Sequence, residues 1–216
     1  MDLVHAAQVP AGEGPFPTLV ALHGWGASAQ DLLGLAPHLA GGRLQVLCPQ
    51  GPVSVPLGPG HQGFGWFPLV PGQPPDPVAF AKASTSLKGF IDQALERYPI
   101  DPRRLAVLGF SQGGIMAYDL ALRWPATFCG LAALSSWLPQ ELAQHLPREP
   151  EARDLPTLVI HGTEDSVVPV ERGRESRTNL ESFGVQLTYE EFPMGHEIRP
   201  AALASVERWI QGCLLP

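Results

Sequence analysis

Short apolar runs alternate with longer amphipathic segments along most of the chain. The short runs are rich in Val, Leu and Ile and are almost continuously hydrophobic, which favours strands buried on both faces of a parallel sheet. We expect these strands at residues 18–22, 44–49, 105–109, 130–134, 157–160 and 185–192. The alternation predicts an α/β fold with a mainly parallel central sheet and helices on both faces.

The intervening segments carry apolar residues at helical spacing. In the clearest case the apolar positions are Leu87, Phe90, Ile91, Ala94, Leu95 and Tyr98. This series stops before Pro99, a residue that cannot continue a helix. Comparable helices are expected at about residues 29–40, 112–123, 171–183 and 200–212. Because there is no internal repeat and no linker, we expect a single domain over residues 1–216.

One segment, Pro52 to Pro77, interrupts this rhythm and is rich in proline and glycine. We expect a long loop here, and loops of this length in a compact domain are usually functional or disordered. Its large apolar side chains are Phe64, Trp66, Phe67, Leu69 and Val70. Two interpretations are open. The aromatic residues form a wall for an apolar ligand, which would make Trp66 and Phe67 substrate-binding residues, or they fill the core beneath the loop.

Composition and charge narrow the class of protein. With 216 residues and 44% apolar side chains, the chain can build one domain with a sizeable core. The formal charge is −7 and the basic residues form no stripe that could follow a phosphate backbone, so we expect no nucleic-acid partner. The first residues carry neither a basic nor an apolar leader pattern, and no stretch is long enough to span a bilayer. We therefore expect a soluble cytoplasmic protein without integral membrane association; the oligomeric state stays open.

The chemistry centres on Gly109-Phe110-Ser111-Gln112-Gly113, which lies between an expected strand and an expected helix. This is the context of a nucleophile elbow. The sharp reversal leaves no space for side chains at Gly109 and Gly113, while the turn pushes the Ser111 hydroxyl outward. The start of the helix directs backbone N–H groups at an anion beside the serine. A turn without catalytic role is the alternative, and the flanking strand and helix make it the weaker one.

A serine hydroxyl needs a base, and after such an elbow the acid and the histidine follow in that chain order. His145, His161 and His196 follow the serine. His145 lies in a polar stretch, whereas His196 comes directly after the last expected strand, where Gly195 allows a turn. We therefore predict His196 as the base, with a surface or capping histidine as the alternative.

For the acid, we select Asp165, with Glu164 as the second choice. Both follow the strand expected at 157–160. The carboxylate would accept the imidazole N–H and stabilise the cation formed when the base takes the serine proton. The alternative is that Asp165 only bonds amides of its own turn. Its position between the serine and His196 in the chain favours the catalytic role.

An oxyanion hole completes the prediction. Gln112 supplies one amide by its position after the nucleophile, and the turn after the first expected strand, His23-Gly24-Trp25-Gly26, supplies a second from Trp25, whose side chain would also line the acyl pocket. The same glycines resemble a dinucleotide fingerprint, but the next expected strand ends without the required acid. The sequence has no metal-ligand spacing either, so we expect no metal and no cofactor.

These residues resemble the α/β-hydrolase superfamily, and within it the small phospholipase/carboxylesterase group that includes acyl-protein thioesterases. The matching pieces are Leu22 to Gly26, Trp66-Phe67, Gly109 to Gly114, His161 to Pro169 and Gly195-His196. The resemblance implies an α/β-hydrolase fold without a separate cap domain, the triad Ser111, Asp165 and His196, and oxyanion amides from Trp25 and Gln112. Members of that group commonly carry leucine where Trp25 stands, and the indole would shorten the acyl pocket.

The sequence thus predicts a serine carboxylesterase that cleaves short- to medium-chain esters through an acyl-enzyme on Ser111. The partner expected is a small-molecule ester or acyl substrate. Acyl-protein thioesterase or lysophospholipase activity would use the same groups, and an amidase is less favoured. A non-catalytic, ligand-binding version of the fold is the alternative from another class, because fold alone does not fix function.

Overall fold

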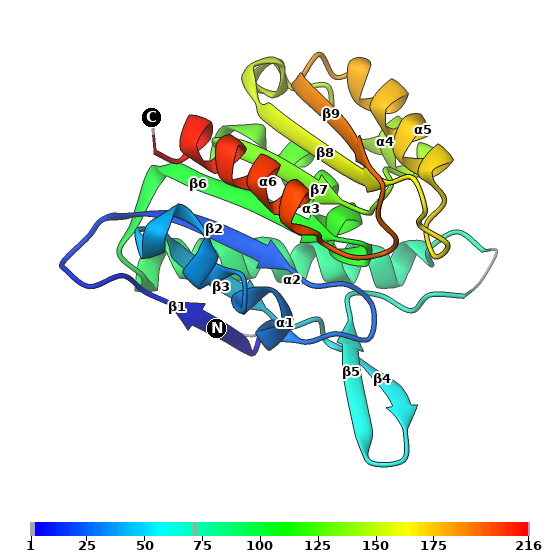
Figure 1. Ribbon diagram of the computed structural model, residues 1–216, viewed down its shortest axis with the longest axis horizontal. Helices are drawn as coiled ribbons and strands as arrows, with labels where there is room; N and C mark the ends of the chain where they lie inside the picture. The colour runs from blue at the N-terminus through cyan, green and yellow to red at the C-terminus, as the bar shows by residue number, and fades with distance from the viewer. Residues whose placement is uncertain (1–2, 71–72, 216) are drawn as a thin grey trace.

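A seven-stranded sheet forms the centre of the protein, of which the computed structural model describes residues 3–70 and 73–215 (Figure 1). The strand order is β1-β3-β2-β6-β7-β8-β9. The strands are β1 (His5–Gln8), β2 (Phe16–Leu22), β3 (Gln45–Pro49), β6 (Ile100–Phe110), β7 (Gly130–Leu134), β8 (Pro156–Gly162) and β9 (Gln186–Phe192). All neighbours pair in parallel except β1, which is antiparallel to β3. The predicted α/β class with a mainly parallel sheet is confirmed.

Helices cover both faces of this sheet, as expected. They are α1 (Ala29–Leu33), α2 (Pro77–Arg97), α3 (Gln112–Arg123), α4 (Gln140–His145), α5 (Val170–Glu181) and α6 (Pro200–Cys213). Short 3₁₀ turns lie at Ala36–His38, Ala40–Gly42, Pro125–Thr127 and Pro150–Asp154. Helices α1 and α6 pack on one face, and α2, α3 and α5 pack on the other (Figure 1). No helix within residues 3–70 and 73–215 combines the length and the apolar character needed to cross a bilayer.

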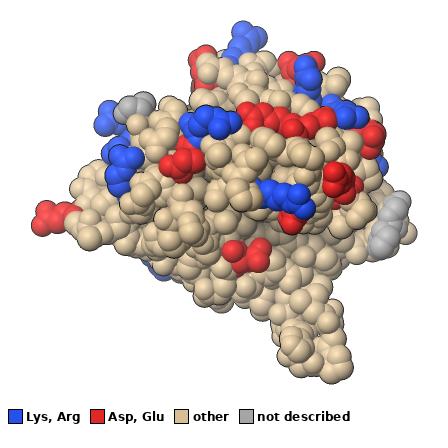
Figure 2. Space-filling model, viewed as in Figure 1, with Lys and Arg blue, Asp and Glu red and all other residues tan. Residues whose placement is uncertain are grey.

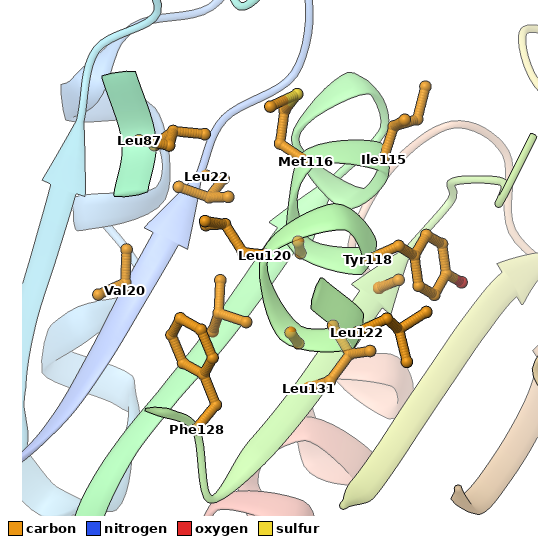
Figure 3. Close-up of a cluster of buried hydrophobic side chains, with 14 of the residues drawn as sticks. Val20, Leu22, Leu87, Ile115, Met116, Tyr118, Leu120, Leu122, Phe128 and Leu131 are labelled. Atoms are coloured by element: carbon orange, nitrogen blue, oxygen red, sulfur yellow. The ribbon is translucent and has the colours of Figure 1, made fainter. Parts of the chain in front are cut away.

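The two apolar layers follow from the alternation of side chains along buried strands. In β2, Val20 and Leu22 point into the layer under α2 and α3, whereas Leu19 and Ala21 point into the layer under α1 and α6. Helix α3 is buried along nearly its whole length and presents a broad apolar surface to the first layer (Figure 3). Because these strands are buried on both faces, their sequences are almost continuously apolar.

The segment expected to be a loop was predicted wrongly over residues 53–65. It forms a two-stranded antiparallel hairpin of β4 (Val53–Gly58) and β5 (His61–Gly65), which projects from the body of the protein (Figure 1). Pairing between the two strands satisfies the backbone hydrogen-bonding groups of this segment. The high proline and glycine content gave no sign of such pairing. The local sequence patterns also do not predict β1, a short edge strand, or α4, a helix of six residues.

The helix expected at about 29–40 is shorter than predicted. Helix α1 ends at Leu33, and the chain continues through two 3₁₀ turns that contain Pro37 and Gly41. Proline removes a backbone donor, and Gly41 adopts a positive φ of 60° that interrupts helical geometry. The other expected helices correspond to α2, α3, α5 and α6. Wherever a helix end was predicted, the observed end lies within a few residues of it.

Candidate active site

Ser111 lies in a sharp turn between β6 and α3, as the sequence predicts. Its backbone has φ 52° and ψ −119°, a conformation that is strained for a residue with a side chain and typical of functional sites. A Cβ on Gly109 would lie 2.1 Å from the Gly113 carbonyl oxygen, and one on Gly113 would lie 2.0 Å from the Leu22 carbonyl oxygen. Only glycine fits at either position, so the two glycines are what allow the turn.

Neighbouring strands hold this strained turn in place. The Ser111 amide donates to the Leu134 carbonyl at 2.9 Å, and the Ser136 hydroxyl donates to the Ser111 carbonyl at 2.7 Å. Leu134 is the last residue of β7, the next strand of the sheet, and Ser136 lies just after it. The serine is 9% exposed, so little of the residue is open to solvent. The turn therefore holds Ser111 on a fixed and largely enclosed backbone.

Asp165 and His196 meet at the same edge of the sheet. They follow β8 and β9, and because parallel strands end at a common edge, the topology brings both loops beside the turn at Ser111. Asp165 Oδ2 accepts a hydrogen bond from His196 Nδ1 at 2.8 Å. Asp165 Oδ1 accepts from the amides of Val167 and Val168 at 2.9 and 2.8 Å.

This arrangement fixes the tautomer of His196. The carboxylate of Asp165 is an acceptor, so Nδ1 carries the proton and Nε2 is free to accept one. The side chain of Asp165 is fully buried, whereas that of His196 is 19% exposed. Glu164, the second choice for the acid, is exposed. The aspartate thus serves both the turn amides and the imidazole, which unites the two interpretations of its role.

The Ser111 hydroxyl makes no hydrogen bond to His196 within the part of the chain that the structure describes. The two residues are connected through Phe110, whose ring lies 4.9 Å from the imidazole, centroid to centroid. In unliganded serine hydrolases this contact is often longer than in the substrate complex. The arrangement supplies an accessible serine and a base with an oriented free nitrogen on the same edge.

The two other histidines after Ser111 lie elsewhere. His145, on α4, is exposed, and its Nδ1 contacts the Glu141 carbonyl at 2.6 Å. His161 is buried behind Asp165: its Nε2 donates to the Val168 carbonyl at 2.8 Å and lies 3.8 Å from Asp165 Oδ2. His161 therefore contacts the same loop as Asp165, a contact that the sequence alone does not indicate.

The candidate oxyanion amides flank Ser111. Gln112 is the first residue of α3, so its N–H lies at the positive end of that helix. The Trp25 N–H has no acceptor among the described residues, while the adjacent Gly26 N–H donates to the Phe64 carbonyl at 2.8 Å. A Cβ on Gly24 would lie 3.3 Å from the Ser111 Cβ, so this loop passes directly over the serine. One free amide remains where an oxyanion would form.

A buried network holds the loop at residues 23–27, here called the oxyanion loop. The side chain of Gln112 accepts from the Trp66 amide at 2.9 Å and donates to the Phe67 carbonyl at 2.7 Å. The Trp66 indole N–H donates to the His23 carbonyl at 2.8 Å. The elbow, the oxyanion loop and the base of the hairpin are therefore joined by side chains that local sequence patterns do not identify.

His23 extends this network to the residue before the hairpin. Its Nε2 accepts from the Gly51 amide at 3.0 Å, so Nδ1 carries the proton and donates to the Gly24 carbonyl at 2.7 Å. Burial lowers the pKa of His23 below its usual range because it disfavours the charged imidazolium. A neutral His23 is the form that can accept from Gly51.

Two aromatic residues of the segment 52–77 lie in the core, whereas Trp25 of the facing loop is exposed. Trp66 and Phe67 are fully buried in the layer beneath the hairpin, which agrees with filling of the core and not with direct exposure to a ligand. Trp25 is 36% exposed, and its ring lies against the backbone of Gly65, where an added Cβ would be 2.3 Å away. Pro71 and Gly72 of this segment lie outside the described residues.

Charge is distributed unevenly around the site. The chain has no Lys, Arg, Asp or Glu between Leu44 and Pro75, and the projecting hairpin accordingly carries no coloured side chain in the space-filling view (Figure 2). The acidic and basic residues gather on the helices and on the other loops. Within residues 3–70 and 73–215, His, Cys, Asp and Glu side chains form no group of three that could hold a metal ion.

Comparison with known proteins gives a consistent result. The model of the phospholipase/carboxylesterase family matches residues 5–214. A probable carboxylesterase of Oryza sativa subsp. japonica is 34% identical over 155 residues, which cover 69% of this chain and 58% of that protein. Acyl-protein thioesterase 1 of Gibberella zeae is 28% identical over 214 residues, which cover 90% of this chain and 86% of that protein.

Solved structures agree in fold. The crystal structure of esterase PE8 superimposes with a TM-score of 0.84 and 25% identity over 99% of this chain and 100% of that chain. The chain covers less than two thirds of the length of the plant carboxylesterases that it matches.

Proposed function

Because this chain belongs to the phospholipase/carboxylesterase family, we propose that it is a serine carboxylesterase that transfers an acyl group to Ser111 and then to water. The observation that carries this proposal is the hydrogen bond of 2.8 Å between the buried carboxylate of Asp165 and His196 Nδ1, at the same sheet edge as the strained serine. Such a pair orients an imidazole so that its second nitrogen can take a proton. We further propose that the domain over residues 1–216 carries out the whole reaction.

The first half of the reaction forms the acyl-enzyme. His196 Nε2 takes the proton of the Ser111 hydroxyl as the oxygen attacks the ester carbonyl. The negative charge that develops on the carbonyl oxygen is stabilised by the amides of Trp25 and Gln112. Asp165 stabilises the imidazolium, which then gives its proton to the leaving alcohol as the carbon–oxygen bond breaks.

The second half releases the acid. A water molecule loses a proton to His196 and attacks the acyl carbonyl, and the same two amides stabilise the second tetrahedral intermediate. The imidazolium returns the proton to the Ser111 oxygen as the acid leaves. Every step uses groups of this chain, so the proposal includes no metal and no cofactor.

We propose short- to medium-chain acyl groups because Trp25 belongs to the loop that passes over the serine and its indole is partly exposed. The indole covers Gly65 and is partly exposed, so an acyl chain that leaves the oxyanion loop would meet it. Trp66 and Phe67 are buried, and we therefore assign them to the support of this wall instead of to direct substrate contact. This changes the role that the loop interpretation gave them.

Acyl-protein thioesterase activity is the second candidate function. It is favoured by the similarity to the Gibberella zeae protein, which extends over 90% of this chain. The same serine, base and amides would cleave a thioester. Parallel measurement of kcat/KM on an ester and a thioester with the same acyl group would rank the two.

We also propose a cytoplasmic location. Cys48, Cys129 and Cys213 are all free thiols in the structure, and burial raises the pKa of Cys48 to about 12. Thiols without disulfides are usual in reducing compartments. A small-molecule substrate is the partner that this proposal requires.

The direct test is covalent labelling by a fluorophosphonate, followed by intact-mass and peptide-mass spectrometry. We expect one adduct, located at Ser111, and loss of both the adduct and ester turnover in Ser111→Ala, by about 10⁴-fold or more for turnover. Ser54→Ala, an exposed serine of the hairpin, serves as the matched control and should be labelled like the unaltered protein. An adduct at another residue, or turnover retained in Ser111→Ala, would contradict the proposal.

A further inference from the structure

A hollow of about 260 Å³ lies beside His196, between α1 and the segment that follows β9. It is lined by Asp31, Leu32, Leu35, Phe110, His196, Glu197 and Ile198. We propose that this hollow, here called the α1 hollow, receives the alcohol part of the ester substrate. The alcohol that fits has a compact apolar body and no negative charge. This inference rests on the proposed esterase function and specifies its substrate class.

The position of the imidazole determines which part of the substrate would enter. The leaving oxygen must take its proton from His196 Nε2, because Nδ1 is held by Asp165. The alcohol therefore departs along the imidazole. The α1 hollow is bounded by that imidazole and by Phe110, the residue directly before the nucleophile. An alcohol group bonded to a carbonyl at Ser111 would therefore leave on the side of this hollow.

The acyl part has a different place. Trp25 and the base of the hairpin lie at the oxyanion loop, and none of Trp25, Trp66 and Phe67 lines the α1 hollow. The two substrate parts diverge from the reacting carbon, so two separate spaces are required. The oxyanion loop and the α1 hollow meet this requirement on two different segments of the chain.

The residues that line the hollow indicate which kind of alcohol group would bind there. Leu32 is buried, and Leu35, Ile198 and Phe110 are partly buried apolar side chains, so most of the wall gains from contact with an apolar group. The Phe110 ring can pack against an aromatic group of the alcohol, either in an offset stack or edge to face. A volume of about 260 Å³ accommodates a single ring more readily than a long chain.

The rim of the hollow carries negative charge. Asp31 is exposed and forms no salt bridge with any described residue, whereas Glu197 is paired with Arg199 at 2.7 Å. The lining of the hollow therefore includes one carboxylate without a salt bridge among the described residues, and it repels an anionic alcohol. Esters of uncharged alcohols should consequently be preferred over lysophospholipids, whose phosphate belongs to the leaving part.

The experiment compares butyrate esters that differ only in the alcohol: ethyl, benzyl and 4-carboxybenzyl. Before the kinetic measurements, a separate sample of the unaltered protein is labelled with a fluorophosphonate. This labelling tests the esterase proposal independently of the alcohol subsite. We expect kcat/KM to be about tenfold or more higher for the benzyl than for the ethyl ester, in the range that apolar subsite contacts produce. We expect the 4-carboxybenzyl ester to be several-fold poorer than the benzyl ester, by a factor that falls as salt is added.

Two variants locate the effect. Leu35→Trp fills the hollow and should reduce the benzyl-to-ethyl ratio to about twofold or less, whereas Val78→Trp, an equally bulky change at an exposed position of α2, should leave the ratio unchanged. Asp31→Asn should raise kcat/KM for the 4-carboxybenzyl ester by a few-fold at low salt. Asp154→Asn, the same change at an exposed residue at the opposite edge of the sheet, should not.

Each result has one meaning. An unchanged benzyl-to-ethyl ratio in Leu35→Trp, when a separate sample of the same variant is labelled by the fluorophosphonate at Ser111, would overturn the α1 hollow as the alcohol subsite while leaving the esterase intact. Equal effects of Asp31→Asn and Asp154→Asn would overturn the role of the rim charge. Absence of labelling in the unaltered protein would overturn the esterase function itself, and with it this inference.

Discussion

The two flanks of Ser111 are built in different ways. On the hairpin flank, backbone groups are held by buried hydrogen bonds: Gln112 binds the segment at Trp66 and Phe67, and His23 binds Gly51. On the α1 flank, apolar side chains surround a hollow beside His196. Hydrogen bonds fix positions to within fractions of an ångström, whereas apolar walls tolerate changes of shape.

This difference suggests that one flank mainly serves the catalytic rate and the other mainly serves the choice of substrate. The hairpin flank contains the amides proposed to stabilise the oxyanion, and such groups must be in place before the reaction. The α1 flank is proposed to contact only the part of the substrate that leaves. Changes to the hairpin flank should therefore lower the rate for every ester, and changes to the α1 flank should alter the ranking of esters.

The largest effect is expected from Gln112→Met, which keeps the size of the side chain but removes both of its hydrogen bonds. The Trp66 amide and the Phe67 carbonyl would be buried without partners, at a cost of about 1–3 kcal/mol each. The oxyanion loop would lose its support, and kcat should fall by about 10- to 100-fold for all acyl lengths with little change in KM. Urea unfolding and steady-state kinetics measure the two effects.

The control for this prediction lies in the hairpin itself. Gln62 is exposed, and its amide donates to the Ser54 hydroxyl at 2.8 Å. Gln62→Met should change the free energy of unfolding by about 0.5 kcal/mol or less and leave kcat unaltered. If Gln112→Met behaved like Gln62→Met, the buried network would have no part in holding the loop.

An intermediate effect is expected from pH at His23. Its pKa is lowered by burial from the ordinary value of 6.5, so the unfolded chain binds a proton that the folded protein excludes. Stability is therefore complete above pH 6.5 and is lost as the pH falls toward the lower, folded-state pKa. The slope in this window approaches about 1.4 kcal/mol per pH unit from this one residue.

His23→Gln tests this source of pH dependence. The variant should be less stable than the unaltered protein at pH 7.5, because a hydrogen bond to Gly51 is weakened, but the difference should shrink between pH 6.5 and 5.5. Urea unfolding at several pH values provides both curves, and the other histidines are common to the two proteins. Parallel curves would show that His23 does not link protonation to the stability of this flank.

The sequence allowed one flank to be anticipated better than the other. Ser111, Asp165 and His196 could be located because each follows a strand of clear pattern and the chain order of the three is fixed by the fold. The partners of Gln112 and His23 could not, because they are set by contacts between segments 28–46 residues apart. The sequence shows only that a polar side chain lies beside a motif. It does not show which residue that side chain binds.

The hairpin and the hollow were beyond local patterns for a similar reason. Glycine and proline in residues 52–77 predict a loop, while the hairpin depends on pairing between two strands and on the close approach of Gly63 to the Gly26 carbonyl. The α1 hollow combines residues 31–35, Phe110 and residues 196–198. No periodicity within one segment describes a space that three segments enclose.

The smallest expected effect is on acyl-chain preference in Trp25→Leu. The indole lies against Gly65, and leucine would free part of this space without removing the Trp25 amide from the oxyanion loop. The ratio of kcat/KM for p-nitrophenyl octanoate to that for the butyrate should rise by about three- to tenfold, the scale of a few apolar contacts in a pocket. The preference for benzyl over ethyl butyrate should stay the same, because the indole does not line the α1 hollow. A shift in both profiles would show that the two flanks share one space, and an unchanged acyl profile would show that the acyl chain leaves Ser111 along a path that avoids Trp25.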